Sequence, residues 1–403
     1  MRKTNRWMKL LLILPILLLA VLAAGIGWDM WKGNEKPGYA LATEAWVSDS
    51  ETHGADAAQT EETTTEETEI LQEPALVVNS QTEASSEQED PVVTMVFAGD
   101  IYLSDHVLAA YDQAGGMGGV LDEAYRQVIA DSHMFIANQE FPFSTRGEKA
   151  PDKQYTFRLP PERVSIMNEI GADLVSLANN HSMDYGVDAL LDTCQVLDEA
   201  GILHVGAGAD INQAKKLEII EAEGKKIGFL GASRVYPDVS WMAWENHPGM
   251  MSGYDPTVLL EQIQAAKEQC DYVVVYIHWG VERSEIPEEY QRELGYKMID
   301  VGADLVVGSH PHVLQGIEYY NGKPIVYSLG NFIFGSSIPR TALLKVDVDF
   351  EKGTASLSLI PGTSKAGYTR TVTEPEVLQE FYNYVQSISF GITVDEKGVV
   401  QGA

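Results

Sequence analysis

The sequence predicts an α/β fold, and two patterns carry this prediction. From Val92 to Val307, short continuous apolar runs alternate with longer segments that have helical periodicity. This alternation is typical of a largely parallel sheet whose faces are covered by helices. Beyond residue 316, apolar segments instead flank the turn pairs Asn321-Gly322 and Lys352-Gly353, which indicate antiparallel strands.

The expected elements follow one another through a domain at residues 91–403. Continuous apolar runs predict buried strands, at 92–98, 134–137, 174–178, 203–205, 272–277 and 305–307. Segments with helical periodicity separate them, at 120–130, 162–170, 187–200, 257–269 and 288–301. Glu223-Gly224 predicts a hairpin between 217–221 and 226–230. Antiparallel strands at 316–334 and 341–360 and a helix at 374–387 complete the domain.

The first 32 residues have the composition of a membrane anchor. Basic residues, from Arg2 to Lys9, precede an uncharged apolar run from Leu10 to Trp28 that is long enough to cross a bilayer as a helix. Because basic residues hold their end in the cytoplasm, we expect a single-pass protein of the cell membrane with its domain outside the cytoplasm. The alternative is a cleaved signal peptide, since residues 20–24 resemble a cleavage site, and a secreted protein.

Residues 33–90 form an acidic, polar segment. Its runs of Glu and Thr, with Lys36 as the one basic residue, give it low hydrophobicity and high charge. Such a segment cannot bury enough apolar surface to offset the entropy of ordering. We therefore expect a disordered linker between the anchor and the domain.

Charge and cysteine content restrict the class of protein. The formal net charge of −31 argues against nucleic acid as a partner. It does not exclude an anionic polymer, because a bound metal ion can supply local positive charge. Cys194 and Cys270 both lie in segments with the composition of a core, so we expect two buried thiols, with a disulfide as the alternative.

Polar side chains that can bind metal follow five of the predicted strands. They are Asp100, Glu140, Asn180 with His181, His278, and His310 with His312. Taken singly, such residues are ordinary turn, cap or surface residues. Because the carboxyl ends of parallel strands meet at one edge of a sheet, the five groups together predict a single site.

The residue types at this site favour a divalent cation. Carboxylate, amide oxygen and imidazole ligands suit Mn, Fe, Zn or Mg, and a shared carboxylate can bridge two ions about 3.5–4 Å apart. His181 follows the expected ligand Asn180 and suits a general acid or an oxyanion donor. Trp279 and Glu282 come directly after His278 and would line the substrate cleft, with core packing an equal alternative for Trp279.

The motif series as a whole resembles that of the capsule-synthesis CapA family, the poly-γ-glutamate biosynthesis proteins. This family is similar in fold to calcineurin-like metallophosphoesterases. The resemblance covers about residues 92–362 and rests on motifs in the same order: Gly99-Asp100, Asn138-Gln139-Glu140, Leu177-Ala178-Asn179-Asn180-His181, His278-Trp279-Gly280-Val281-Glu282, Gly308-Ser309-His310-Pro311-His312 and Ser328-Leu329-Gly330-Asn331-Phe332.

The resemblance implies a fold, a site and partners. The fold is a four-layer α/β/β/α sandwich with two central sheets, and the site binds one or two metal ions. His181 matches the catalytic histidine, Asn331 falls at a substrate-binding position, and the metal positions are matched by Asp100, Glu140, Asn180, His278, His310 and His312. The implied partners are an anionic surface polymer such as polyglutamate and other membrane proteins of capsule synthesis. The sequence departs from the phosphoesterase pattern at Tyr102, where those enzymes have a histidine ligand, at Glu140, where they have Asp, and at Asn179, where they have Gly.

Three functions are compatible with this sequence. The leading hypothesis is a membrane-anchored extracytoplasmic protein of capsule or cell-surface polymer biosynthesis, a metal-dependent hydrolase or transferase. The second is a secreted metal-dependent phosphatase or nucleotidase. The third, favoured by Tyr102, is a polymer-binding scaffold without catalysis.

Overall fold

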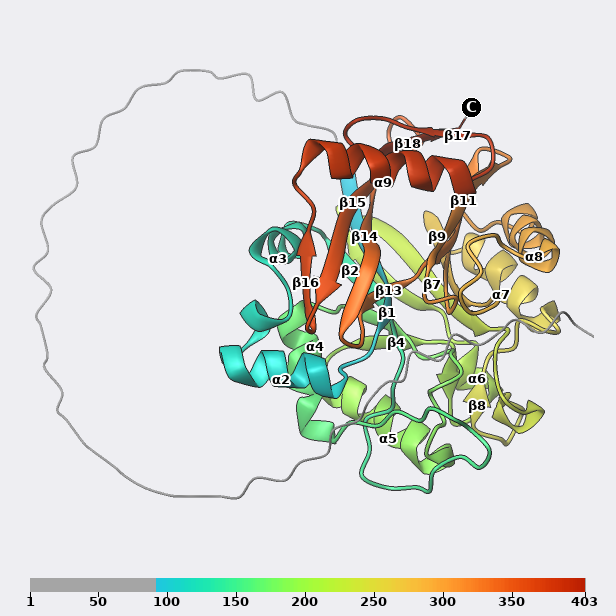
Figure 1. Cartoon of the computed structure of the whole chain (residues 1–403). Coiled ribbons are helices and arrows are strands. Elements are labelled where there is room, and N and C mark those ends of the chain that lie inside the picture. Colours follow the sequence, from blue (N-terminus) through green and yellow to red (C-terminus); the bar gives the residue numbers. More distant parts are fainter. Residues whose placement is uncertain (1–91, 403) are drawn as a thin grey trace, which may run out of the picture. The chain divides into compact units, whose positions relative to one another are not determined.

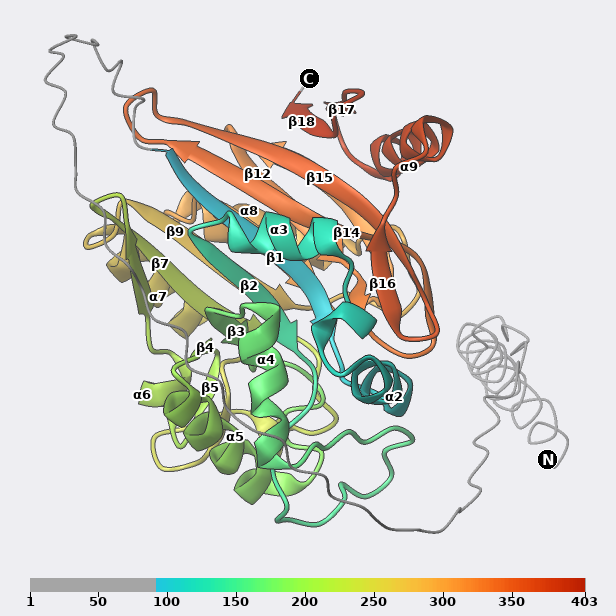
Figure 2. The same cartoon turned by 90° about the vertical axis from the view of Figure 1, so that its left-hand side faces the viewer.

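The computed structural model describes residues 92–402, and it confirms a mixed α/β fold (Figures 1 and 2). The expected anchor at 1–32 and linker at 33–90 lie outside the described residues. Within residues 92–402, no helix combines the length and the apolar content needed to cross a bilayer.

The first large sheet combines parallel and antiparallel strands. Its members are β1 (Val92–Ile101), β2 (Met134–Gln139), β3 (Leu174–Ser176), β4 (Leu203–Val205), β13 (Asn331–Ile333), β14 (Ser337–Asp349), β15 (Thr354–Lys365), β16 (Tyr368–Thr371), β17 (Ile392–Val394) and β18 (Val399–Gly402). The main path is β17-β18-β15-β14-β1-β2-β3-β4, with β13 beside β1 and β16 beside β15. Strands β1 to β4 are parallel, and β14 joins β1 in antiparallel register.

The second large sheet has the order β11-β12-β10-β9-β7-β6. Its members are β6 (Glu218–Ala222), β7 (Lys225–Ser233), β9 (Tyr272–His278), β10 (Leu305–Ser309), β11 (Leu314–Tyr320) and β12 (Lys323–Leu329). Strands β7, β9, β10 and β12 are parallel, whereas β6 and β11 are antiparallel at the two edges. A separate short pair consists of β5 (Ala207–Gly208) and β8 (Gly249–Met250).

Helices flank both sheets. They are α2 (Asp105–Ala114), α3 (Glu123–Ala130), α4 (Val164–Ile170), α5 (Gly186–Ala200), α6 (Ile211–Ala214), α7 (Thr257–Lys267), α8 (Glu289–Asp300) and α9 (Pro375–Ile388), with single 3₁₀ turns at Met117–Gly119, Pro161–Arg163 and Val239–Trp241. In Figure 1, α7 and α8 lie on one side of the sheets, and α3 and α4 lie on the other.

Three apolar clusters show how the layers stack. In β1, Val96 and Ala98 face a cluster shared with α3, α4 and α5, whereas Met95 and Phe97 face a cluster shared with the second sheet. A third cluster lies between the second sheet and α7 and α8. The order is therefore helices, sheet, sheet, helices, and α9 closes one end of the cluster between the sheets (Figure 1).

The strand pattern alone did not reveal that there are two sheets. The alternation of strands and helices indicated one largely parallel sheet, whereas β1 to β4 lie in the first sheet and β7, β9, β10 and β12 lie in the second. A continuous apolar run indicates a strand that is buried on both faces, and it does not reveal whether the covering layer is a helix or another sheet. The hairpin at Glu223-Gly224 begins the second sheet, and both residues have positive φ, as its tight turn requires.

Other expectations hold with small shifts. Strand β1 continues through Gly99 and Asp100, and β10 continues to Ser309, so both reach into the motifs that follow them. Cys194 and Cys270 are buried and free. Helix α2 was not predicted, because Val107 is its one fully buried residue and it lacks a clear apolar stripe.

Candidate metal centre

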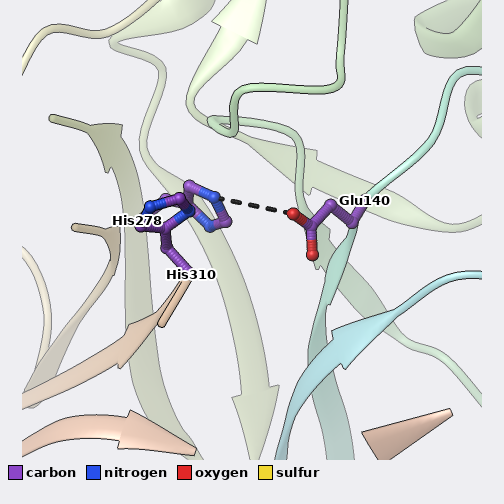
Figure 3. Close-up of side chains that lie close together, drawn as sticks. All are labelled: Glu140, His278 and His310. Atoms are coloured by element: carbon purple, nitrogen blue, oxygen red, sulfur yellow. Dashed lines mark ion pairs between the residues drawn. The ribbon is translucent and has the colours of Figure 1, made fainter. Parts of the chain in front are cut away.

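The polar strand ends of the two sheets converge on one place. Ligand atoms of Glu140, His278 and His310 lie within 4.8 Å of one another, and so do those of Asp100, Glu140 and His312. Figure 3 shows the imidazoles of His278 and His310 facing the Glu140 carboxylate, with His278 Nε2 3.8 Å from Glu140 Oε1. Glu140 belongs to both groups and joins a site that is built from both sheets.

Asn180 completes the first group. Its side-chain Oδ1 lies 2.8 Å from Nε2 of His278, the nitrogen that is itself 3.8 Å from Glu140 Oε1. The structure therefore brings together all six residues that the sequence predicted as metal ligands. His181 is adjacent, with Nε2 3.9 Å from Glu140 Oε1.

Several buried polar atoms at this site have no hydrogen-bond partner among the described residues. They are Oδ2 of Asp100, both carboxylate oxygens of Glu140 and Nδ1 of His310. Asp100 and Glu140 are fully buried. Burying a neutral polar group without a hydrogen bond costs about 2–7 kcal/mol, and burying an ionised carboxylate costs more unless it is neutralised or coordinated. A cation would satisfy these atoms together, so the residues present fit a divalent metal ion.

A polar network holds the candidate ligands in place. Nδ2 of Asn138 donates to Asp100 Oδ1 at 2.8 Å, and Nδ2 of Asn179 donates to Asn138 Oδ1 at 3.0 Å. Ser309 Oγ lies 2.9 Å from Nδ1 of His278, so the other ring nitrogen of His278 is directed at the site. Such hydrogen bonds fix the tautomer and the orientation of a ligating histidine.

The loop after β10 is strained where it carries two of the histidines. His310 and His312 both have positive φ, 103° and 59°. Non-glycine residues rarely adopt this conformation, and it costs of order 1–3 kcal/mol when the surrounding structure imposes it. The strained backbone turns both imidazoles toward the site, with their ring centroids 5.8 Å apart.

Burial and charge shift the pKa values of the ligand groups in opposite directions. Burial, reinforced by the Asp100 carboxylate, raises the pKa of Glu140 well above its ordinary value. Burial lowers the pKa of His278 well below its ordinary value and that of His310 to about 3, so both imidazoles are neutral. Burial opposes protonation of His312 as well, but the carboxylates of Glu140 and Asp100 raise its pKa to about 10.

His181 is held by residues that the sequence analysis did not identify. Its Nδ1 lies 2.7 Å from Oδ2 of the buried Asp184 and 3.1 Å from Nζ of Lys153. Lys153 also donates to Asp184 and to the main-chain oxygen of Asn180. The ring of Phe157 stacks on His181 with centroids 4.1 Å apart. Burial lowers the pKa of His181, so the neutral ring can accept a proton at Nε2.

These positioning residues had weak signals in the sequence. Lys153 and Phe157 lie in the irregular segment 140–160, which has no periodicity to interpret. Asp184 follows His181 by three residues, a spacing that allows a side-chain contact within one turn, and this was the one available signal.

Four further residues of interest have distinct surroundings. Trp279 does not line the site, because its indole is fully buried against Tyr327 and donates to the Tyr327 carbonyl at 2.8 Å. Of the two roles that the sequence left open for Trp279, the structure thus shows core packing.

Glu282 is exposed, and its carboxylate contributes to raising the pKa of Glu140 and of Lys153. Asn331 Oδ1 lies 2.8 Å from His312 Nδ1, and the ring of Tyr102 stacks on Phe157 at 3.8 Å.

Comparisons with known proteins identify the family of this chain. The model of the family described as bacterial capsule synthesis protein PGA_cap matches residues 94–336, more than half of the chain. The PGA biosynthesis protein CapA of Bacillus subtilis is 35% identical over 257 residues, which are 62% of this chain and 66% of that protein. The capsule biosynthesis protein CapA of Bacillus anthracis is 33% identical over 299 residues, 71% of each chain.

Similarity to solved structures is weaker. The NAD nucleotidase of Haemophilus influenzae aligns with 12% identity and a TM-score of 0.44, over 74% of this chain and 63% of that one. Agreement at this level says nothing about activity. The family model and the Bacillus relatives confirm the resemblance found in the motifs, and the chain belongs to the bacterial capsule synthesis protein PGA_cap family.

Proposed function

We propose that this chain is a metal-dependent accessory protein of capsule or cell-surface polymer biosynthesis, and that it handles an anionic polymer of the poly-γ-glutamate type. The observation that carries the proposal is the convergence of unpartnered buried ligand atoms inside the segment that matches the capsule family. The helix–sheet–sheet–helix order supports a fold of the metallophosphoesterase type.

The metal would be held by six side chains in two groups that share Glu140. One group is Glu140, Asn180, His278 and His310, and the other is Asp100, Glu140 and His312. When bound, a divalent ion polarises a carbonyl or phosphoryl oxygen and lowers the pKa of water. We infer that the four-residue group binds its ion more tightly, because Tyr102 packs on Phe157 and adds no ligand to the other group.

The chain's own chemistry centres on His181. Asp184 fixes the ring through Nδ1, and Phe157 holds its plane, so Nε2 faces the ligand groups. A neutral imidazole in this position can take a proton from an attacking nucleophile or deliver one to a leaving group. Lys153 adds a positive charge next to His181 and offsets the Asp184 carboxylate.

We further propose that the domain works outside the cytoplasm, tethered by the apolar helix expected at residues 10–28 and spaced by the acidic linker. In that position it would act alongside other membrane proteins of capsule synthesis. A tagged full chain should fractionate with the membrane and be accessible to protease added to intact cells. If the tagged domain were protected from protease added to intact cells, as a cytoplasmic domain would be, this arrangement would be contradicted.

The test in cells compares gene deletion with single substitutions in the native host. Deletion should lower the amount of γ-linked glutamate polymer at the surface, measured by composition analysis after acid hydrolysis. His310→Ala should behave like the deletion, whereas the exposed His133→Ala should behave like wild type. Unchanged surface polymer after deletion would refute the proposed function.

Experiments on purified protein distinguish the leading proposal from two alternative functions. The His181–Asp184 pair beside the ligand groups favours a phosphoesterase, which predicts turnover of a phosphoester panel that a chelator abolishes. The packing of Tyr102 favours a scaffold, which predicts binding of glutamate oligomers with no change in their length and no effect of His181→Ala. Shortening or transfer of γ-glutamyl oligomers that requires His181 supports the leading proposal over both.

A further inference from the structure

Arg234 lies one strand away from the candidate metal centre. It directly follows Ser233, the last residue of β7, and β7 pairs with β9 so that Ser233 is in register with His278. The main-chain N–H of Arg234 donates to the carbonyl oxygen of His278 at 2.8 Å. Its side chain therefore starts from the same sheet edge that carries the ligands.

Tyrosine rings hold the guanidinium. Its central carbon is 3.7 Å from the ring centroid of Tyr290 and 5.2 Å from that of Tyr254. Tyr290 is fixed in turn, because its hydroxyl accepts from the main-chain N–H of Gly280 at 2.8 Å. Tyr254 packs edge-on against Tyr236, whose hydroxyl is hydrogen-bonded to Ser252. A flat guanidinium over an aromatic face is stabilised by cation–π attraction and keeps a defined plane.

The charge of Arg234 has no acidic partner among residues 92–402. No ion pair and no side-chain hydrogen bond joins it to another described residue, although the chain has 59 acidic residues against 28 basic ones. Arg292 shows the contrasting case, since it both stacks on an aromatic ring and pairs with Glu318. Tyr290 covers one side of the guanidinium, and Arg234 is partly exposed, so its N–H groups, unpaired within the described part of the chain, can reach a ligand.

We infer that Arg234, Tyr254 and Tyr290 form a carboxylate-binding subsite for a polymeric substrate. The inference rests on the proposed function and adds the group that recognises the polymer's charge. An arginine fork matches a carboxylate with two parallel hydrogen bonds, and preformed stacking reduces the entropy lost when they form. In a polymer with a carboxylate on every unit, a carboxylate anchored at this sheet edge would restrict which linkage is presented to the metal centre.

The test measures binding of a purified γ-linked glutamate oligomer to the full chain by titration calorimetry, at fixed low salt. Arg234→Gln should weaken binding by about 10- to 100-fold, the range for a charge-assisted bidentate contact. Tyr254→Ala removes a ring that is 55% exposed, so the fold should tolerate it, and it should weaken binding by about 2- to 10-fold. Arg234→Lys keeps the charge without the fork and should recover only part of the affinity.

Lys225→Gln is the matched control. Lys225 is the first residue of β7 and lies over the ring of Phe350, so it is also a cation on an aromatic face. It stands at the opposite end of the same nine-residue strand, about 30 Å from Arg234. Its substitution removes the same charge and should leave binding unchanged. All variants should retain the metal content and thermal stability of wild type.

Each outcome has a distinct meaning. Wild-type affinity in Arg234→Gln, or an equal loss in Lys225→Gln, overturns the subsite. If the wild type binds polygalacturonate in an Arg234-dependent way but binds no glutamate oligomer, the subsite stands and the proposed polymer is wrong. If it binds neither polycarboxylate, the subsite is overturned, and the metal centre is judged separately by metal content.

Discussion

At the scale of single residues, Glu140 is the group that most constrains the site. Its carboxylate is fully buried, neither oxygen has a hydrogen-bond partner among the described residues, and Asp100 lies beside it. Without a cation, such a group lowers its energy by holding a proton, which is why its pKa is raised. A bound cation would favour the ionised carboxylate of Glu140, which belongs to both ligand groups. Metal binding and proton release are therefore coupled at this residue.

This coupling predicts the pH dependence of metal affinity. Glu140 has a raised pKa and His312 has a pKa of about 10, so this neighbouring pair holds a proton that an incoming ion must displace. The neutral His278 and His310 add no competition. Affinity for Mn²⁺ should rise from pH 6 to pH 8, and calorimetry in buffers of different ionisation enthalpy should detect proton release. Affinity that is flat or falls over this range would contradict the assignment.

His181 should separate catalysis from metal binding. His181→Ala removes the proton-transfer group but none of the proposed ligands, so turnover should fall by about 10²–10⁴-fold. Metal content should stay at the wild-type level. Asp184→Asn should reduce turnover as well, because its amide cannot fix the ring of His181 through Nδ1 as the carboxylate does. Loss of metal in His181→Ala would assign this residue to the ligands instead.

At the scale of elements, helix α8 is tied to the second sheet by one acidic residue. Glu318 on β11 accepts hydrogen bonds from Arg292 and Tyr296 on α8 and from Tyr327 on β12. Burial alone would raise the pKa of Glu318, but these donors lower it below its ordinary value. The network stabilises the fold only while Glu318 is ionised.

Glu318→Gln should therefore destabilise the protein at neutral pH, by about 1–2 kcal/mol. A lowered folded-state pKa contributes stability above the unfolded value, about 4.3, and this contribution is lost as pH falls through the folded pKa. The difference in unfolding temperature between wild type and variant should thus become smaller below about pH 4.3. Glu293→Gln, an exposed position on the same helix, is the control. A difference that is constant with pH would contradict this account.

Elements also show how far the sequence alone could lead. Strands such as Tyr272–His278 and Leu305–Ser309 were predictable because they are continuous apolar runs. The polar residues at or after the ends of the predicted strands included all six candidate ligands. Lys153 and Phe157 were not predictable, since an irregular loop reaches its place through tertiary contacts. The division into two sheets was likewise absent from the strand pattern and followed only from the resemblance of the motifs.

At the scale of the whole molecule, the candidate centre links the two sheets. In the first sheet, Asp100 lies on β1 and Glu140 directly follows β2; in the second, His278 lies on β9 and His310 directly follows β10. An ion bound there would add a contact between the sheets that the unfolded chain lacks. Binding should then stabilise the fold as a whole.

Manganese added to metal-free protein should raise the temperature of thermal unfolding. At a free concentration of about 100 times Kd, the gain is about 2.7 kcal/mol, a shift of several degrees for a domain of this size. Glu140→Gln should abolish the shift, because it removes the charge shared by both ligand groups. A shift that persists in Glu140→Gln would place the ion elsewhere.

The most direct test of the metal centre is to purify the full chain without chelators and to measure its metal content by elemental mass spectrometry. Wild type and the surface variant His133→Ala should carry a stoichiometric divalent metal, and Asp100→Ala and His310→Ala should lose part or all of it. These two variants remove one ligand from each group around Glu140. Wild-type protein that holds no metal after incubation with Mn, Fe, Zn and Mg would contradict the account.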